Sequence, residues 1–193
     1  MVPRNDPISD ALSAHLDLVR GLEGLRQSVE AFAAEVHATI TRGGRVFLVG
    51  NGGSAADSQH LAAELVGRFE RERRGLPAIA LTTDTAVLTS VANDYGFESV
   101  FARQVEALGR PGDILVGLST SGNSANVVSA MERAHQLGLF RVGLTGEGGG
   151  KLRQCCELWL GVPSRSTARI QEAHMLIGHI VCDLVEQRVA AAL

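Results

Sequence analysis

The chain alternates short, continuously apolar segments with longer segments whose apolar residues recur at helical spacing, and this alternation limits the fold more than any other feature. A strand that is apolar at every position must be buried on both faces, which is typical of a parallel sheet covered by helices on each side. The sequence therefore predicts a doubly wound α/β sandwich. Strands are expected at residues 45–49, 78–81, 113–118, 141–144 and 158–162.

Helices are expected to follow these strands, at residues 55–69, 85–91, 100–108, 125–137 and 167–190, with a short helix after the glycines at 146–150. Before the first strand, Asp6-Pro7 is typical of a helix start. Apolar residues then recur at helical spacing to about Thr41, and Gly21 and Gly24 predict a break into two helices. This apolar stripe either packs against its own domain or forms a helical arm used for oligomerisation.

The organisation of the chain follows from this pattern. No linker or low-complexity segment divides the sequence. We expect one domain over residues 1–193, with leading helices over 1–43 and an α/β core with its C-terminal helix over 44–193.

Composition narrows the classes of function. The 193 residues carry a formal net charge of −3, which gives no electrostatic reason to expect nucleic-acid binding. Lys151 is the only candidate for Schiff-base chemistry, and three cysteines without a CxxC pair predict reduced thiols. Residues 1–7 lack the features of a signal peptide, and no run reaches the roughly 18 apolar residues of a membrane helix. We therefore expect a cytoplasmic protein with no membrane partner.

Two polar loops each follow a predicted strand and open a predicted helix. The first reads Gly50-Asn51-Gly52-Gly53-Ser54 and the second Ser119-Thr120-Ser121-Gly122-Asn123-Ser124. Ligands bind at the carboxyl ends of strands in such sheets, and a helix N-terminus offers free N–H groups that suit an anion. Glycine, serine and asparagine also simply make good turns. Two such loops in one sheet favour a phosphate or sugar site.

Competing motifs fit the sequence poorly. The first loop is a permitted variant of the dinucleotide fingerprint, but Asp84 follows the second strand only after Leu81-Thr82-Thr83. Gly150-Lys151-Leu152 lacks the hydroxyl residue of an ATP-binding loop. No G-x-S-x-G motif is present to support a serine nucleophile. Hydride transfer, ATP hydrolysis and serine hydrolysis are therefore not expected.

Ionisable residues on two helices are candidates for chemistry. His60 and Glu64 are four residues apart and share a helix face, which suits either a metal site or acid–base catalysis. Gln171 and His179 are separated by about 12 Å of helix rise, so they must converge strongly or come from different subunits to bind one ion. Spacing pairs Glu172 with His179 equally well. We interpret His174 as a hydrogen-bonded core residue.

The charged run at residues 68–74 alternates arginine and glutamate around Phe69. Mixed charges of this kind are typical of a solvated surface. We expect a solvent-exposed helix end here.

Five segments together resemble the sugar-isomerase (SIS) domain family along nearly the whole chain. They are Gly50-Asn51-Gly52-Gly53-Ser54, Gln59-His60-x-x-x-Glu64, Ala92-Asn93-Asp94-Tyr95-Gly96, residues 114–124 and Arg169-Ile170-Gln171-Glu172. The serine-rich segment is shared with many SIS proteins, whereas the combination of His60, Glu64, Gln171 and His179 is much more specific. The resemblance implies a flavodoxin-like sandwich and conversion of D-sedoheptulose 7-phosphate to D-glycero-D-manno-heptose 7-phosphate, the first step of heptose precursor biosynthesis.

The resemblance also implies how the site is built. It implies a homotetramer with active sites at subunit interfaces, one Zn²⁺ per subunit, and Glu64 and His179 as catalytic residues. The zinc ligands would be His60, Glu64, Gln171 and His179. Substrate contacts would come from Asn51, Gly52, Gly53, Ser54, Glu64, Asn93, Asp94, Ser119, Thr120, Ser121, Ser124 and Gln171. Many members have aspartate where this chain has Ala168, so that polar contact is not expected here.

A second hypothesis comes from a non-enzymatic branch of the same family, which binds the bacterial replication initiator. That branch resembles this chain closely, including Thr167-Ala168-Arg169-Ile170-Gln171-Glu172. It lacks the acid corresponding to Glu64 and the imidazole corresponding to His179, and this chain has both. A sugar-phosphate-sensing regulator would need a DNA-binding region, for which the sequence has no candidate.

Overall fold

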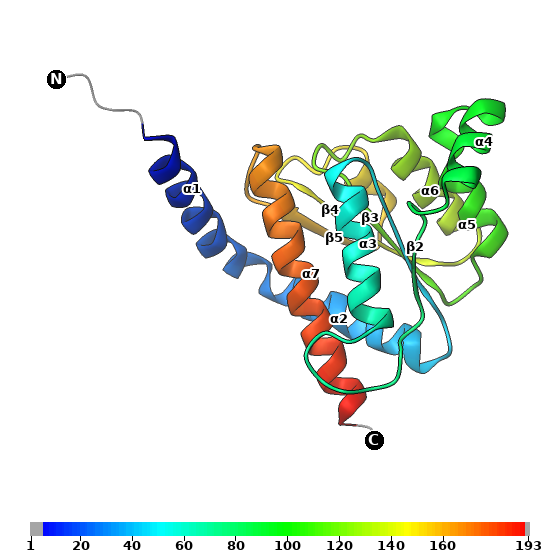
Figure 1. Cartoon of the computed structure of the whole chain (residues 1–193), viewed down its shortest axis with the longest axis horizontal. Coiled ribbons are helices and arrows are strands. Elements are labelled where there is room, and N and C mark those ends of the chain that lie inside the picture. Colours follow the sequence, from blue (N-terminus) through cyan, green and yellow to red (C-terminus); the bar gives the residue numbers. More distant parts are fainter. Residues whose placement is uncertain (1–5, 192–193) are drawn as a thin grey trace.

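The core of the molecule is a five-stranded parallel sheet with the strand order β2-β1-β3-β4-β5 (Figure 1). The structure is a computed structural model that describes residues 6–191. The strands are β1 (Val46–Gly50), β2 (Ala78–Ala80), β3 (Ile114–Leu118), β4 (Phe140–Gly146) and β5 (Leu158–Val162). This order reverses direction between β1 and β3, which defines a doubly wound sheet and confirms the predicted fold class.

The helices alternate with the strands as the sequence predicts. The α-helices are α1 (Pro7–Gly21), α2 (Arg26–Thr41), α3 (Gly53–Val66), α4 (Thr85–Tyr95), α5 (Ala102–Leu108), α6 (Ala125–Gln136) and α7 (Thr167–Ala190). Three short 3-10 helices are η1 (Leu22–Leu25), η2 (Phe97–Ser99) and η3 (Leu152–Cys155). The predicted break at Gly21 and Gly24 is therefore real, and it consists of a 3-10 turn between α1 and α2.

The central strands β1 and β3 bury both of their faces, which explains their continuous apolar runs, whereas the edge strand β2 leaves Ile79 38% exposed. On β1, Val46 and Leu48 point into a cluster with α2, α3 and α7, whereas Phe47 and Val49 point into a second cluster with α5 and α6. All five residues of β1 are buried. The sheet is thus covered by helices on both sides.

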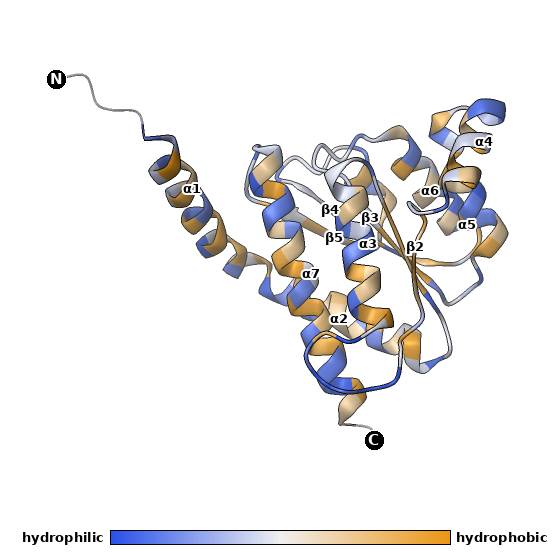
Figure 2. Ribbon diagram, viewed as in Figure 1, coloured by the Kyte–Doolittle hydropathy of each residue, from blue (hydrophilic) through white to orange (hydrophobic). Residues whose placement is uncertain are grey.

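Helix α1 projects away from this body (Figure 1). The Asp6 carboxylate accepts hydrogen bonds from the first backbone N–H groups of α1, which confirms the predicted helix start. Figure 2 shows apolar residues along its length, and Ile8, Leu12 and Leu16 are 73%, 63% and 56% exposed. Most of the leading stripe on α1 therefore does not pack against its own chain.

The charged run at residues 68–74 corrects the sequence prediction, because it is neither helical nor fully solvated. Helix α3 ends at Val66, and the following residues form a loop, residues 67–75, which we call the arginine loop. Arg73 is only 8% exposed and forms an ion pair with the fully buried Glu186. A buried guanidinium needs a counter-charge and acceptors for its N–H groups, and the acid that pairs with Arg73 lies on α7, far from this run in the sequence.

No helix within residues 6–191 has both the length and the apolar character that a membrane span requires.

Candidate active site

Helices α3 and α7 lie side by side and carry most of the candidate residues (Figure 1). Both follow parallel strands, so both begin at the carboxyl edge of the sheet and run in the same direction. The side chain of Gln171 lies against Gly53 in the first turns, and Leu61 lies against Gly178 two turns further on. Glycine at position 178 permits this close approach, because a Cβ atom there would lie 2.4 Å from Leu61 Cδ2.

The approach brings together three of the predicted ligands, which we call the His–Glu–His cluster: His60, Glu64 and His179. The Nε2 atoms of the two histidines are 3.0 Å apart, and His60 Nε2 is 3.2 Å from Glu64 Oε1. Potential ligand atoms of all three residues lie within 4.8 Å of one another. His60 is exposed, and Glu64 and His179 are half-buried, so the cluster is open to solvent on one side.

The other candidates on α7 separate in space. Gln171 lies level with Gly53, two helical turns from His179, so a single chain does not bring it to the cluster. Glu172 faces α1 instead: its carboxylate bonds His15 Nδ1 at 2.6 Å and Arg169 Nη2 at 2.6 Å. The alternative pairing of Glu172 with His179 is therefore wrong.

His174 is a core residue, as the sequence analysis expects. It is fully buried, and its Nε2 lies 3.3 Å from the carbonyl oxygen of Thr145. Burial lowers the pKa of His174 to about 4, although the bond to the Thr145 carbonyl opposes this shift. The ring is therefore neutral near pH 7.

The second predicted loop, residues 119–124, connects β3 to α6, and we call it the serine loop. The hydroxyls of Ser119 and Ser124 are 2.9 Å apart, and Ser124 stands at the N-cap of α6 without capping it through its side chain. Gly122 has φ +68°, and a Cβ atom there would lie 2.1 Å from the carbonyl oxygen of Gly149. The backbone therefore holds two hydroxyls beside a helix N-terminus, which is an arrangement suited to an anion.

Paired amides connect the two predicted loops. Asn51 and Asn126 exchange two hydrogen bonds of 2.8 Å each, so the end of β1 is fixed relative to the first turn of α6. Asn126 is 3% exposed and was not among the predicted residues. The available signal was an asparagine in the first turn of a predicted helix, but the residue it bonds lies 75 positions away in the sequence.

The remaining residues predicted to contact the substrate lie at several places around the carboxyl edge of the sheet. Gly52 and Gly53 are exposed at the start of α3, Ser54 is buried there, and Thr120 and Ser121 lie in the serine loop. Asn93 and Asp94 are exposed at the end of α4, where the Asn93 amide donates to Asp94 at 2.8 Å. No residue of α4 is buried, so this helix lies at the periphery of the chain.

Two further residues beside the cluster were missed by the sequence analysis. The ring of Phe69 packs against His179 with 5.4 Å between ring centroids. Asp57 lies one turn before His60, and burial raises the pKa of its carboxyl, an effect that the nearby His60 partly opposes. Phe69 sits in the charged run and Asp57 on a mixed helix face, so spacing alone did not single them out.

The fold is a doubly wound parallel α/β sheet with the serine loop at the point where the strand order reverses, which is where ligands bind in α/β proteins of this class. Residues 13–146 match the family described as the SIS domain, and the chain belongs to this family.

Its relatives are named phosphoheptose isomerase. The chain is 55% identical over 181 residues to the phosphoheptose isomerase of Roseiflexus sp. (strain RS-1), which covers 93% of this chain and 92% of the relative. The structure of phosphoheptose isomerase GmhA from Neisseria gonorrhoeae is similar, with a TM-score of 0.89, 42% identity, and coverage of 94% and 97%. A phosphoheptose isomerase from Francisella tularensis gives a TM-score of 0.91, 40% identity and the same coverage. These similarities place the chain among enzymes.

Proposed function

We propose that this chain is a cytoplasmic isomerase that converts D-sedoheptulose 7-phosphate to D-glycero-D-manno-heptose 7-phosphate, at the start of heptose precursor biosynthesis. The convergence of His60, Glu64 and His179 carries the proposal, because it joins a carboxylate and two imidazoles from helices far apart in the sequence. The relatives named phosphoheptose isomerase support the choice of substrate. The replication-initiator hypothesis is not favoured, since the two residues that its branch lacks both lie in this cluster.

The donors of the cluster fit a zinc ion. Tetrahedral zinc with bonds of about 2.0–2.1 Å holds its ligand atoms roughly 3.3 Å apart. The observed separations of 3.0 Å between the two Nε2 atoms and 3.2 Å to Glu64 Oε1 are close to this value. Two imidazoles and a carboxylate are a ligand set that suits Zn²⁺ better than Mg²⁺. Bound zinc would polarise the substrate carbonyl and stabilise negative charge on its oxygen.

Proton transfer is assigned to two residues of the cluster. Conversion of a 2-ketose to an aldose through a cis-enediol requires one proton to move from C1 to C2 and a second proton to move from the oxygen on C1 to the oxygen on C2. The Glu64 carboxylate removes the C1 proton and returns it to C2; its Oε1 faces His60, which leaves Oε2 for the proton. The His179 imidazole moves the second proton from the oxygen on C1 to the oxygen on C2.

Substrate binding is assigned to the two loops. Ser119, Thr120, Ser121 and Ser124 would hold the phosphate at the N-terminus of α6. The sugar would contact Asn51, Gly52, Gly53, Ser54, Asn93, Asp94 and Gln171. The rise of α3 from Gly53 to His60 is about 10 Å, so an extended sugar phosphate can reach from the loops toward the cluster.

A homotetramer with active sites between subunits would complete this site. The exposed apolar residues of α1 favour burial against another copy of the chain. Gln171 lies two turns from the cluster of its own subunit, so as a fourth zinc ligand it would be contributed by a neighbouring subunit. The exposed position of Asn93 and Asp94 at the margin of the subunit is consistent with the same arrangement.

The test is turnover of sedoheptulose 7-phosphate before chelation, after chelation and after zinc is returned. We expect chelation to abolish conversion without unfolding the chain, and zinc to restore it. Glu64→Gln and His179→Ala should each abolish conversion and leave a folded oligomer, because both residues line an open site rather than the core. A zinc-loaded chain that converts none of this substrate, or an active Glu64→Gln variant, would contradict the proposal.

A further inference from the structure

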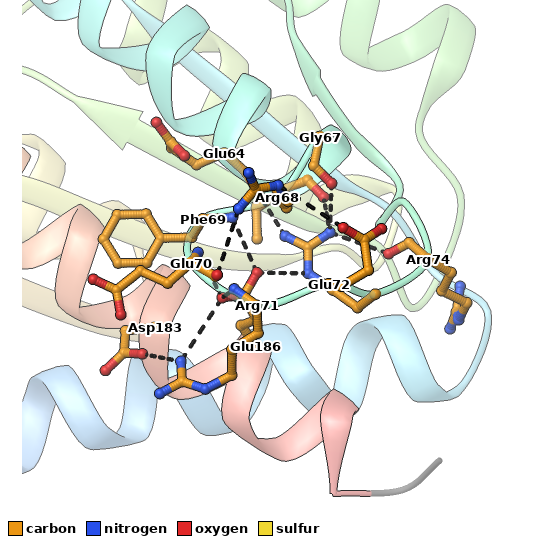
Figure 3. A network of polar contacts seen from close by, with 12 residues as sticks. Glu64, Gly67, Arg68, Phe69, Glu70, Arg71, Glu72, Arg74, Asp183 and Glu186 are labelled. Carbon is orange, nitrogen blue, oxygen red and sulfur yellow. Dashed lines mark hydrogen bonds and ion pairs between the residues drawn. The ribbon is translucent and has the colours of Figure 1, made fainter.

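Glu186 is a fully buried carboxylate that the proposed mechanism does not use. It lies on α7, seven residues and so two helical turns after His179, on the same side of the helix. Figure 3 shows that the arginine loop wraps around it. Its oxygens accept hydrogen bonds from the backbone N–H groups of Phe69, Glu70 and Arg71, at 3.0, 2.8 and 2.7 Å.

The charge of Glu186 is compensated within this loop. Arg73 Nε is 3.1 Å from Glu186 Oε1, and both side chains are fully buried. Burial raises the pKa of the Glu186 carboxyl, but the three N–H donors and Arg73 outweigh it and hold the pKa below its usual value. The residue is therefore ionised at neutral pH, and its charge is needed to satisfy its four partners.

Arg73, which pairs with Glu186, also bonds the end of α3. Its Nη2 donates to the carbonyl oxygen of Glu64 at 2.8 Å, and its Nη1 donates to those of Leu65 and Gly67 at 2.9 and 3.0 Å. The Glu64 and Leu65 carbonyls belong to the last turn of α3, where no N–H groups of the helix itself remain to bond them, and Gly67 is the C-cap residue. The Leu65 carbonyl also accepts a hydrogen bond from the Leu76 N–H at 3.0 Å. The guanidinium thus fixes the turn that carries Glu64.

The loop also reaches the third member of the cluster. Phe69, whose N–H group bonds Glu186, packs its ring against His179 at 5.4 Å. One buried carboxylate therefore acts on both helices of the cluster: on Glu64 through Arg73, and on His179 through Phe69. Asp183, one turn away, contacts the loop through the half-buried side chain of Arg71.

We propose that Glu186 is a positioning residue that holds the arginine loop so that Arg73 and Phe69 fix Glu64 and His179 for metal binding; the proposal rests on the metal site of the proposed function. Outer partners of this kind contribute to metal affinity by restricting the positions of the ligands. A purely structural role would instead affect the metal site and the serine loop alike.

The test compares Zn²⁺ affinity, measured by calorimetry on chelated protein, in Glu186→Gln, Phe69→Leu and the control Asp183→Asn. Glutamine keeps the shape of Glu186 but places an amide N–H₂ against donors. We expect Glu186→Gln to weaken zinc binding by about tenfold and Phe69→Leu to weaken it less. Asp183→Asn should stay within about twofold, because it loses a half-exposed ion pair with Arg71 and keeps an amide oxygen that can accept from Gln187.

Affinity for sedoheptulose 7-phosphate without zinc gives the second readout, and it should be unchanged in all three variants. Zinc binding by folded Glu186→Gln at wild-type affinity, or an equal loss of sugar-phosphate binding, would overturn the proposal. If Glu186→Gln does not fold, Phe69→Leu decides alone: unchanged zinc affinity would overturn the role of the loop. If the wild-type chain binds no zinc, the metal site of the proposed function is refuted. That result differs from one in which the wild type binds zinc and the variants do not differ from it, which refutes only the role of Glu186.

Discussion

Replacing Gly178 with alanine tests whether the contact between α3 and α7 sets the geometry of the His–Glu–His cluster. Gly178 lies inside α7, where alanine is intrinsically favoured over glycine by about 1 kcal/mol. The added methyl group would lie 2.4 Å from Leu61 Cδ2 and 3.1 Å from Leu61 Cγ. Leu61 is only 4% exposed, so its side chain is enclosed by the core and cannot simply turn away.

The expected change in the free energy of unfolding is the balance of the steric clash with Leu61 and the helix preference of alanine. Overpacking of a core costs about 1–3 kcal/mol, and the helix preference of alanine offsets about 1 kcal/mol, so the free energy of unfolding should fall by about 0–2 kcal/mol. Ordinary contact begins at 3.4 Å, so the helices must separate locally by up to about 1 Å. His60 and His179 are the chain neighbours of Leu61 and Gly178, and their 3.0 Å separation should widen. We expect zinc affinity to fall about tenfold.

Denaturant unfolding and calorimetric zinc titration measure the two effects in the same preparation. Gly24→Ala is the matched control, because no atom lies within 4 Å of the added methyl group and the backbone there is not left-handed. It should leave zinc affinity unchanged and stability equal or slightly higher. The reasoning is refuted if Gly178→Ala gains the full 1 kcal/mol of helix preference and binds zinc like the wild type.

Two further predictions concern the serine loop and the buried imidazole of His174. Ser119→Ala or Ser124→Ala should weaken sugar-phosphate binding by about 0.5–3 kcal/mol, the range for losing a bond to a charged group, and unchanged affinity in calorimetry would mean that the loop is only a turn. Burial lowers the pKa of His174 to about 4, so the unfolded chain takes up this proton at higher pH than the folded chain. Stability should therefore be full above pH 6.5 and fall by roughly 2 kcal/mol between pH 7 and pH 5. The His174→Gln variant should not show this loss of free energy of unfolding between pH 7 and pH 5. An identical loss in the wild type and the variant would contradict the assignment to His174.

The fold was largely predictable because its signals are local. A strand buried on both faces must be apolar throughout, and the five predicted strands are all present with ends shifted by no more than two residues. The helix starts at Pro7 and Ala125 follow from the capping residue and from the end of the preceding polar loop. The clearest error is the helix predicted over residues 55–69, which ends at Val66.

The helix ends early because the following residues bond Glu186, which lies far away in the sequence. The charged run looks like a solvated helix end, yet Phe69 and Glu70 bond a carboxylate 117 and 116 residues further along the chain. A buried acid that accepts three backbone N–H groups gives the chain an alternative to continuing the helix. The burial of Arg73 follows from the same acid.

In the candidate site, sequence spacing predicts some of the residues that come together, and the packing of α7 on α3 decides the others. The four-residue spacing of His60 and Glu64 places both on one helix face in any context, so this half of the cluster was predictable. Whether Gln171, Glu172 or His179 joins them depends on how far α7 is displaced along α3. The contact of Leu61 with Gly178 fixes that displacement, sets His179 level with His60, and leaves Gln171 beside Gly53. With this displacement His179 reaches the cluster, Gln171 stays beside Gly53, and Glu172 bonds His15 on α1.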